Sequence, residues 1–252
     1  MTIFLAYTIA GVILILAFAR RTKWQDPAVA FGLLGFLLLN MALGTVGRAP
    51  KGKIFAPTMD WYLYRADQYL GMDGLSLARW VFSMPGMKPL LLAAYEALPV
   101  AFAIVWSAER SRVMVRAVLL AALAGYYCYR IAPATGPVYA FPGFPWVAPH
   151  GSGQVLVDVS MPRNCLPSLH FAWALLLLWN CRGRWLALFA SVYLLLTALA
   201  TVGLGEHYFV DLLAAVPFCA AVQALASSKY LNTLRFARAK PETDGLARDQ
   251  SS

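Results

Sequence analysis

Two short segments, far apart along the chain, each place a histidine beside a long apolar run. The first reads Cys-Leu-Pro-Ser-Leu-His at residues 165–170, and the second reads Gly-Glu-His-Tyr-Phe-Val-Asp at residues 205–211. An ionisable side chain in membrane-like surroundings is costly and commonly marks a functional site. His207 also has a carboxylate, Asp211, four residues later. This carboxylate can accept one ring N–H, fix the tautomer and leave the other nitrogen free to attack an electrophile.

Both histidine segments are predicted to be helical. His207 and Asp211 are four residues apart, so we expect them to share one helix face. Pro167 favours the first position of a helix, which would leave the next backbone amides free to hold an anion such as phosphate. Ser168 would add a hydroxyl donor and His170 a proton donor. Taken singly, each segment also fits a structural role, as a helix cap or a His–Asp tie between helices.

The composition predicts an integral membrane protein. Of 252 residues, 60% are hydrophobic and 13% are charged, against about 25% charged in an average soluble domain. The net charge of +9 comes from short basic clusters between apolar runs, a pattern that signals topology and argues against nucleic-acid binding. We expect one membrane-embedded domain at 1–228, with the motif-bearing core at about 113–226, and a disordered tail at 229–252. The four cysteines include no CxxC pair, and no function is assigned to them.

The hydropathy pattern predicts an all-α polytopic membrane helix bundle of about seven spans. An interfacial helix rich in aromatic residues is expected near residues 54–86, and no span is expected in the Pro/Gly-rich loop 132–167. A span needs about 20 mostly apolar residues. The predicted spans lie at 3–19, 29–46, 88–106, 113–131, 168–180, 185–202 and 208–226.

Basic clusters follow the first, third, fifth and seventh predicted spans, which places these ends and the C-terminal tail on the cytoplasmic side. Lys51 and Lys53 fall on the opposite side, against the trend of the four clusters. This orientation predicts that His170 and His207 meet at the non-cytoplasmic face of the membrane. Two histidines, a carboxylate and a helix N-terminus at one face would form a phosphate site with a nucleophile and an acid.

The two segments resemble signature motifs of a known enzyme family. Pro-Ser-x-His at 167–170 and His-x-x-x-Asp at 207–211 look like the second and third motifs of the type 2 phosphatidic acid phosphatase superfamily. The resemblance covers about residues 126–218. Similarity to its inositol phosphorylceramide synthase-like (inositolphosphotransferase) branch rests on three stretches, 129–137, 168–174 and 206–211.

The resemblance implies a metal-independent transfer that needs no cofactor. His207 would attack phosphorus and carry a phosphohistidine intermediate, with Asp211 orienting the ring. His170 would protonate the leaving oxygen and then deprotonate the acceptor, either water or an alcohol. Ser168 and Tyr208 are expected to bind the substrate.

The chain departs from the family pattern in its basic residues. Where the family has an arginine six residues before its last histidine, this chain has Thr201, and Leu123 stands at the place of the first-motif lysine. The charge of a phosphate must then be neutralised by other groups. Arg130 and Arg163 are the candidates.

Together these observations predict a lipid phosphotransferase. The expected partners are a lipid phosphate ester and an alcohol or lipid-hydroxyl acceptor, as in sphingolipid metabolism. With water as the acceptor, the protein would be a phosphatase of a phosphatidate-like or polyprenyl phosphate. A proton-coupled transporter is a further alternative, but a proton relay would distribute ionisable residues through the membrane depth. An inactive scaffold is disfavoured because both histidines and the aspartate are present.

Overall fold

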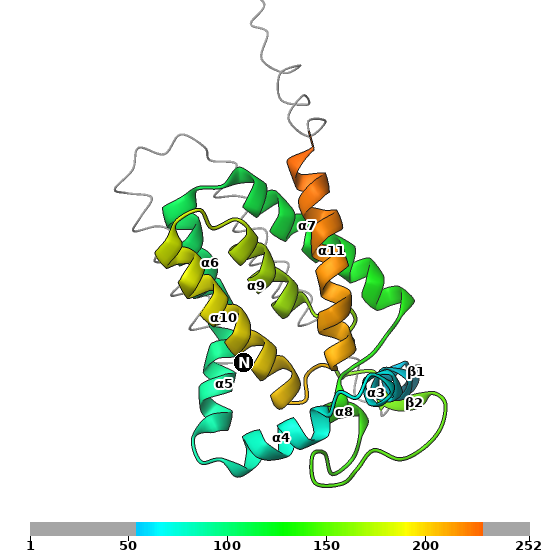
Figure 1. The fold of residues 1–252 in the computed structure, drawn as a ribbon. Helices are drawn as coiled ribbons and strands as arrows, with labels where there is room; N and C mark the ends of the chain where they lie inside the picture. Colours follow the sequence, from blue (N-terminus) through cyan, green and yellow to red (C-terminus); the bar gives the residue numbers. More distant parts are fainter. Residues whose placement is uncertain (1–53, 229–252) are drawn as a thin grey trace, which may run out of the picture.

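The computed structural model describes residues 54–228, which are mostly helical (Figure 1). The predicted spans 3–19 and 29–46, and the tail at 229–252, lie outside the described residues, as do Lys51 and Lys53. The elements are β1 (Phe55–Thr58), α3 (Asp60–Tyr69), α4 (Gly74–Ser83), α5 (Met87–Glu96), α6 (Leu98–Glu109), α7 (Arg112–Ile131), α8 (Pro137–Ala140), β2 (Val155–Asp158), α9 (Leu169–Trp179), α10 (Arg184–Gly203) and α11 (Phe209–Ser227).

Three of the described helices, α7, α10 and α11, are long and apolar enough to cross a membrane. Helices α5 and α6 meet at an angle of 48° and provide a fourth crossing if they form one broken span. The predicted span at 168–180 is instead the 11-residue helix α9. At about 1.5 Å per residue it covers only half of a hydrocarbon core about 30 Å thick. The count of seven spans is therefore not confirmed, although these helices fit an integral membrane protein.

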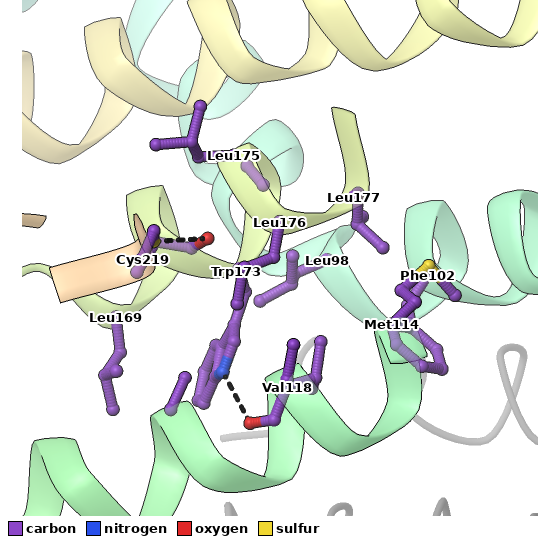
Figure 2. Close-up of a cluster of buried hydrophobic side chains, with 14 of the residues drawn as sticks. Leu98, Phe102, Met114, Val118, Leu169, Trp173, Leu175, Leu176, Leu177 and Cys219 are labelled. Atoms are coloured by element: carbon purple, nitrogen blue, oxygen red, sulfur yellow. Dashed lines mark hydrogen bonds between the residues drawn. The ribbon is translucent and has the colours of Figure 1, made fainter. Parts of the chain in front are cut away.

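Helix α9 lies inside the bundle and packs against α7, α10 and α11. A helix that is apolar on all sides belongs in such a core, and Leu176 is fully buried. Figure 2 shows two polar ties between these helices. The indole Nε1 of Trp173 donates to the carbonyl of Val118 at 3.2 Å, and the thiol of Cys219 donates to the carbonyl of Ala172 at 3.3 Å. These contacts fix the helix that carries His170.

The predicted interfacial helix near 54–86 is in fact a strand followed by two helices, β1, α3 and α4. Helix α3 stops before Gly71, whose φ of 71° is accessible mainly to glycine, and α4 begins after Asp73, whose carboxylate accepts the Ser76 amide. Strand β1 pairs antiparallel with β2, so that Phe55 faces Asp158. The described part of the chain is thus not purely α-helical, and this pairing ties α3 to the long loop.

Several segments meet at one end of the bundle. In Figure 1 the end of α10, the start of α11, α8, α3 and the β-strand pair all lie there. The turn between α10 and α11 carries His207. The two histidine segments therefore reach the same end, with α3 and α8 beside them.

Candidate active site

The turn between α10 and α11 positions His207. The backbone amides of Glu206 and His207 both donate to the carbonyl of Thr201 at 3.0 Å. Gly205 has a φ of 78°, and a side chain there would collide with the ring of Phe144. Only glycine combines this backbone conformation with this close approach. The turn is consequently fixed in one shape.

The spacing predicted that His207 and Asp211 share one helix face, but in the structure they do not. Helix α11 begins at Phe209 with Tyr208 as its N-cap, so His207 lies before the helix. The two side chains meet because Asp211, in the first turn, folds its carboxylate back toward the N-terminus. Its Oδ2 accepts the Tyr208 amide at 2.9 Å and lies 3.4 Å from Nδ1 of His207. Both side chains are buried.

The hydrogen bonds of His207 determine which ring nitrogen carries the proton. Nδ1 lies 3.0 Å from the carbonyl oxygen of Cys165 and 3.4 Å from the Asp211 carboxylate. Both neighbours only accept hydrogen bonds, so Nδ1 must be the donor and Nε2 keeps its lone pair. Nε2 makes no hydrogen bond to any residue that the structure describes. The imidazole is thus held in the tautomer that a nucleophile needs.

Cys165 belongs to this site, although no pattern in the sequence assigns it a function. Its buried thiol donates to Oδ2 of Asp211 at 2.8 Å, while its carbonyl accepts from His207. Burial, followed by the charge of Asp211, raises the pKa of the Cys165 thiol, so the group stays protonated and acts as a donor. Its only sequence signal is its position just before the Pro-Ser segment.

The ligand atoms of Cys165, His207 and Asp211 lie within 4.8 Å of one another, close enough to surround a metal ion. Binding would require a thiolate and a lone pair on Nδ1. In the structure the thiol instead donates to Asp211, and Nδ1 lies 3.0 Å from the carbonyl oxygen of Cys165, so the three residues already satisfy one another through hydrogen bonds. The geometry therefore favours a hydrogen-bonded triad over a metal centre.

His170 lies in the first turn of α9 and is half-buried. Its ring stacks on Tyr95 of α5, with centroids 3.8 Å apart and planes 21° from parallel. The ring of Trp173 lies edge-on to the His170 ring, with the ring centroids 6.1 Å apart. Burial, followed by the charge of His207, lowers the pKa of His170 to about 3, so His170 can hold the proton of a general acid only beside a negatively charged group such as a bound phosphate. The structure thus brings both predicted histidines to one site, and their catalytic roles stay predictions.

Ser168 is the N-cap of α9, and Pro167 precedes the helix instead of opening it. The Ser168 hydroxyl accepts the Phe171 amide at 3.5 Å, and its own amide donates to the carbonyl of Asp211 at 3.3 Å. The predicted anion site therefore loses one of its free amides. Ser168 caps α9 and ties it to α11, and a contact with substrate stays a prediction.

The other predicted substrate-binding residues differ in position. Tyr208 is buried, and its hydroxyl donates to Asp60 of α3 at 2.9 Å. Arg130 is exposed in the last turn of α7, with no hydrogen bond or ion pair to another residue in 54–228. Arg163 is half-buried, with Nη2 3.5 Å from the carbonyl of Val157 and a buried Nε that has no hydrogen-bond partner within this range. Neither of these two described arginines forms a hydrogen bond or an ion pair with His207.

Two aspartates of α3 support the site, and sequence reasoning missed both. The buried carboxylate of Asp60 accepts the amides of Thr135 and Gly136 at 2.9–3.1 Å, besides the Tyr208 hydroxyl. Asp67 accepts the amides of Phe209 and Val210, each at 2.8 Å, and so caps α11. Their signal in the sequence is a spacing of seven residues, which places both on the buried face of α3.

A pocket opens beside His207. It lies between α3 and α4 on one side and the α10–α11 turn on the other, and it brings the nucleophile candidate together with polar groups from α3. Its lining residues are Tyr64, Asp67, Gln68, Gly74, Leu75, Pro137, Phe144, Val202, His207 and Tyr208.

A comparison of the sequence with models of known protein families identifies the superfamily of this protein. A family model described as the PAP2 superfamily matches residues 61–225, about two thirds of the chain. The protein therefore belongs to this superfamily, whose members are generally phosphatases or phosphotransferases acting on phosphate esters. The match begins within α3, well upstream of the resemblance seen in the sequence. No curated protein and no solved structure matches the chain.

Proposed function

We propose that the protein is a membrane phosphotransferase that moves a phospho-head-group from a lipid phosphate ester to an acceptor hydroxyl, as an inositol phosphorylceramide synthase does. The observation that carries this proposal is the tautomer of His207. Its Nδ1 proton is held by a carbonyl and a carboxylate, and its ring borders a pocket. The superfamily and the two stretches at 168–174 and 206–211 support the choice.

The reaction has two half-steps. In the first, Nε2 of His207 attacks phosphorus, the bond from phosphorus to the leaving alcohol oxygen breaks, and His170 donates a proton to that oxygen. Asp211 stabilises the positive charge that develops on the ring. In the second, His170 takes the proton of the acceptor hydroxyl, the acceptor oxygen attacks phosphorus, and the P–N bond breaks. His207 returns to its neutral form.

The lipid substrate is inferred from the setting of the site. His207 lies in the turn between α10 and α11, two helices long and apolar enough to cross a membrane, and the phosphate of an amphiphile would be found at such an end. The basic clusters of the sequence support a site on the non-cytoplasmic face and a cytoplasmic C-terminal tail. Hydrolysis is the second candidate, because the superfamily includes phosphatases and the same residues would activate water.

The test uses purified protein in mixed micelles with ³²P-labelled phosphatidylinositol or phosphatidate, with and without a short-chain ceramide. We expect label on the protein with the acid lability of phosphohistidine, and a loss of turnover of about 10³-fold or more in His207→Ala. His150→Ala is the matched control, because this exposed histidine hydrogen-bonds only to the nearby carbonyl of Ala148 among the described residues.

The products separate the two candidates. A new ceramide-linked phospholipid indicates transfer, and free phosphate or inositol phosphate indicates hydrolysis. Full activity in His207→Ala would rule out the mechanism in either form.

A further inference from the structure

Glu206, the residue before His207, places a second carboxylate at the site. Its backbone N–H donates a hydrogen bond to the Thr201 carbonyl, and its own carbonyl approaches Gly136 so closely that a side chain at 136 would collide with it. Oε1 of Glu206 accepts the hydroxyl of Tyr139 in α8 at 2.9 Å. The side chain is therefore held in place from both ends, although the reaction described above does not use it.

The Glu206 carboxylate lies near His207 and near Tyr95. It adjoins His207 in sequence and acts electrostatically on it. It also acts on Tyr95, the residue whose ring stacks on His170 at 3.8 Å. The carboxylate therefore lies in the same part of the site as His170.

A negative charge in this region would repel a phosphate, so the presence of a carboxylate here needs an explanation. No lysine or arginine in residues 54–228 forms an ion pair with Glu206, and Oε2 makes no hydrogen bond to a residue in this range. Burial raises the pKa of Glu206, which shows that its charge is costly where it stands. A free carboxylate oxygen is a strong acceptor for hydroxyl and amide donors.

We propose that Glu206, held by Tyr139, binds a hydrogen-bond donor next to the reacting hydroxyl of the acceptor. This inference rests on the proposed function and specifies its acceptor: an alcohol with a second hydroxyl or an amide beside the one that reacts. His170 takes the proton of the reacting hydroxyl, while Oε2 of Glu206 accepts the neighbouring donor. A ceramide has such donors, whereas a diacylglycerol has a single hydroxyl and water has no neighbouring group.

The experiment separates the two half-steps. Protein labelled with ³²P-phosphatidylinositol is chased with increasing short-chain ceramide or short-chain diacylglycerol, and the loss of label is measured. Diacylglycerol accepts the head group from the protein and regenerates the donor lipid. The chase with diacylglycerol therefore measures the reverse of the first half-step. In Glu206→Gln, we expect the ceramide concentration for half-maximal loss to rise about tenfold or more, with a smaller shift for diacylglycerol.

Two further variants make the result decisive. Tyr139→Phe removes the hydroxyl that holds the Glu206 carboxylate. It should shift the ceramide dependence in the same direction by a smaller factor. This variant also tests the inference if Glu206→Gln does not fold. Glu109→Gln is the matched control, because Glu109 accepts the amides of Arg182 and Gly183 in the α9–α10 connection, at the opposite end of α10 from Glu206.

Several outcomes would overturn the inference. An unchanged ceramide dependence in Glu206→Gln would do so, as would equal shifts for ceramide and diacylglycerol. If Glu206→Gln slows only the labelling of the protein by phosphatidylinositol, Glu206 binds the donor lipid and not the acceptor. If the unmodified protein takes up no label, the proposed function itself fails, a result that the variants of Glu206 cannot produce.

Discussion

At the scale of single residues, one oxygen of Asp211 carries most of the contacts of the site. Its Oδ2 accepts the Tyr208 amide and the Cys165 thiol and lies 3.4 Å from Nδ1 of His207, whereas the buried Oδ1 has no hydrogen-bond partner in the described chain. The amide and the thiol fix the plane of the carboxylate. The orientation of the imidazole therefore depends on groups that do not touch the substrate.

The first prediction concerns Cys165 as a positioning residue. Cys165→Ala removes the donor to Asp211 and should lower kcat about tenfold with little change in KM, because a hydrogen bond to a charged group contributes about 1.5–3 kcal/mol. Cys165→Ser keeps a donor and should recover most of the activity. Steady-state kinetics in mixed micelles measures both. Equal activity of the Ala and Ser variants would reduce Cys165 to a packing role.

The sequence predicted the reactive residue types but not their supports. His170, His207 and Asp211 were identifiable because ionisable groups beside apolar runs are unusual. The partners of these residues come from tertiary contacts, such as the bond from Cys165 to Asp211 across 46 positions, and no local pattern marks them. The spacing of His207 and Asp211 gave the correct pair for the wrong reason, because the contact is a helix-start geometry and not a shared face.

At the scale of elements, α3 supports both halves of the site. Through Asp60 it holds the Thr135–Gly136 segment and Tyr208, and through Asp67 it caps α11. The sequence indicated only an aromatic interfacial segment here. Buried aspartates that accept backbone amides from distant segments cannot be recognised before the fold is known.

The second prediction compares the pH dependence of two aspartates. Burial raises the pKa of Asp67 to about 6, although the amides of Phe209 and Val210 act in the opposite direction. In the unfolded chain Asp67 loses its proton near pH 4, so its contribution to stability falls as pH rises from about 4 to 6. The difference in Tm between the unmodified protein and Asp67→Asn should decrease over this range and then stay constant.

Asp73 provides the contrast. The Ser76 hydroxyl and amide lower the pKa of Asp73, so its stabilising effect is present above its unfolded value and is lost as pH falls. Asp73→Asn should therefore show the opposite slope at the acidic end of the same thermal unfolding series in detergent. Slopes of the same sign for both variants would contradict the assignment.

At the scale of the whole molecule, the helices were the most predictable feature. Hydropathy located α7, α10 and α11 to within two residues, because a long apolar run has few alternatives to a helix in a membrane. It failed at α9, where a Ser168 cap at one end and Asn180 at the other leave only 11 residues. Apolarity shows that a segment is buried, but not whether lipid or other helices surround it.

The third prediction concerns metal ions. Because Cys165, His207 and Asp211 are engaged with one another through hydrogen bonds, activity should be unchanged, within about twofold, after dialysis against EDTA. The measurement is turnover of the labelled donor before and after chelation, with addition of Zn²⁺ as a second arm. Loss of activity on chelation, restored by Zn²⁺, would assign the three side chains to a metal centre.

The partners of Asp60 lie 75, 76 and 148 positions further along the chain, and those of Asp67 lie 142 and 143 positions away. During biosynthesis, α3 therefore leaves the ribosome long before anything exists for its aspartates to bind. Until α11 has been synthesised, the carboxylate of Asp67 lacks the two amides that it accepts in the finished fold. A polypeptide that stops before α11 therefore lacks both Asp211 and the amides that satisfy Asp67.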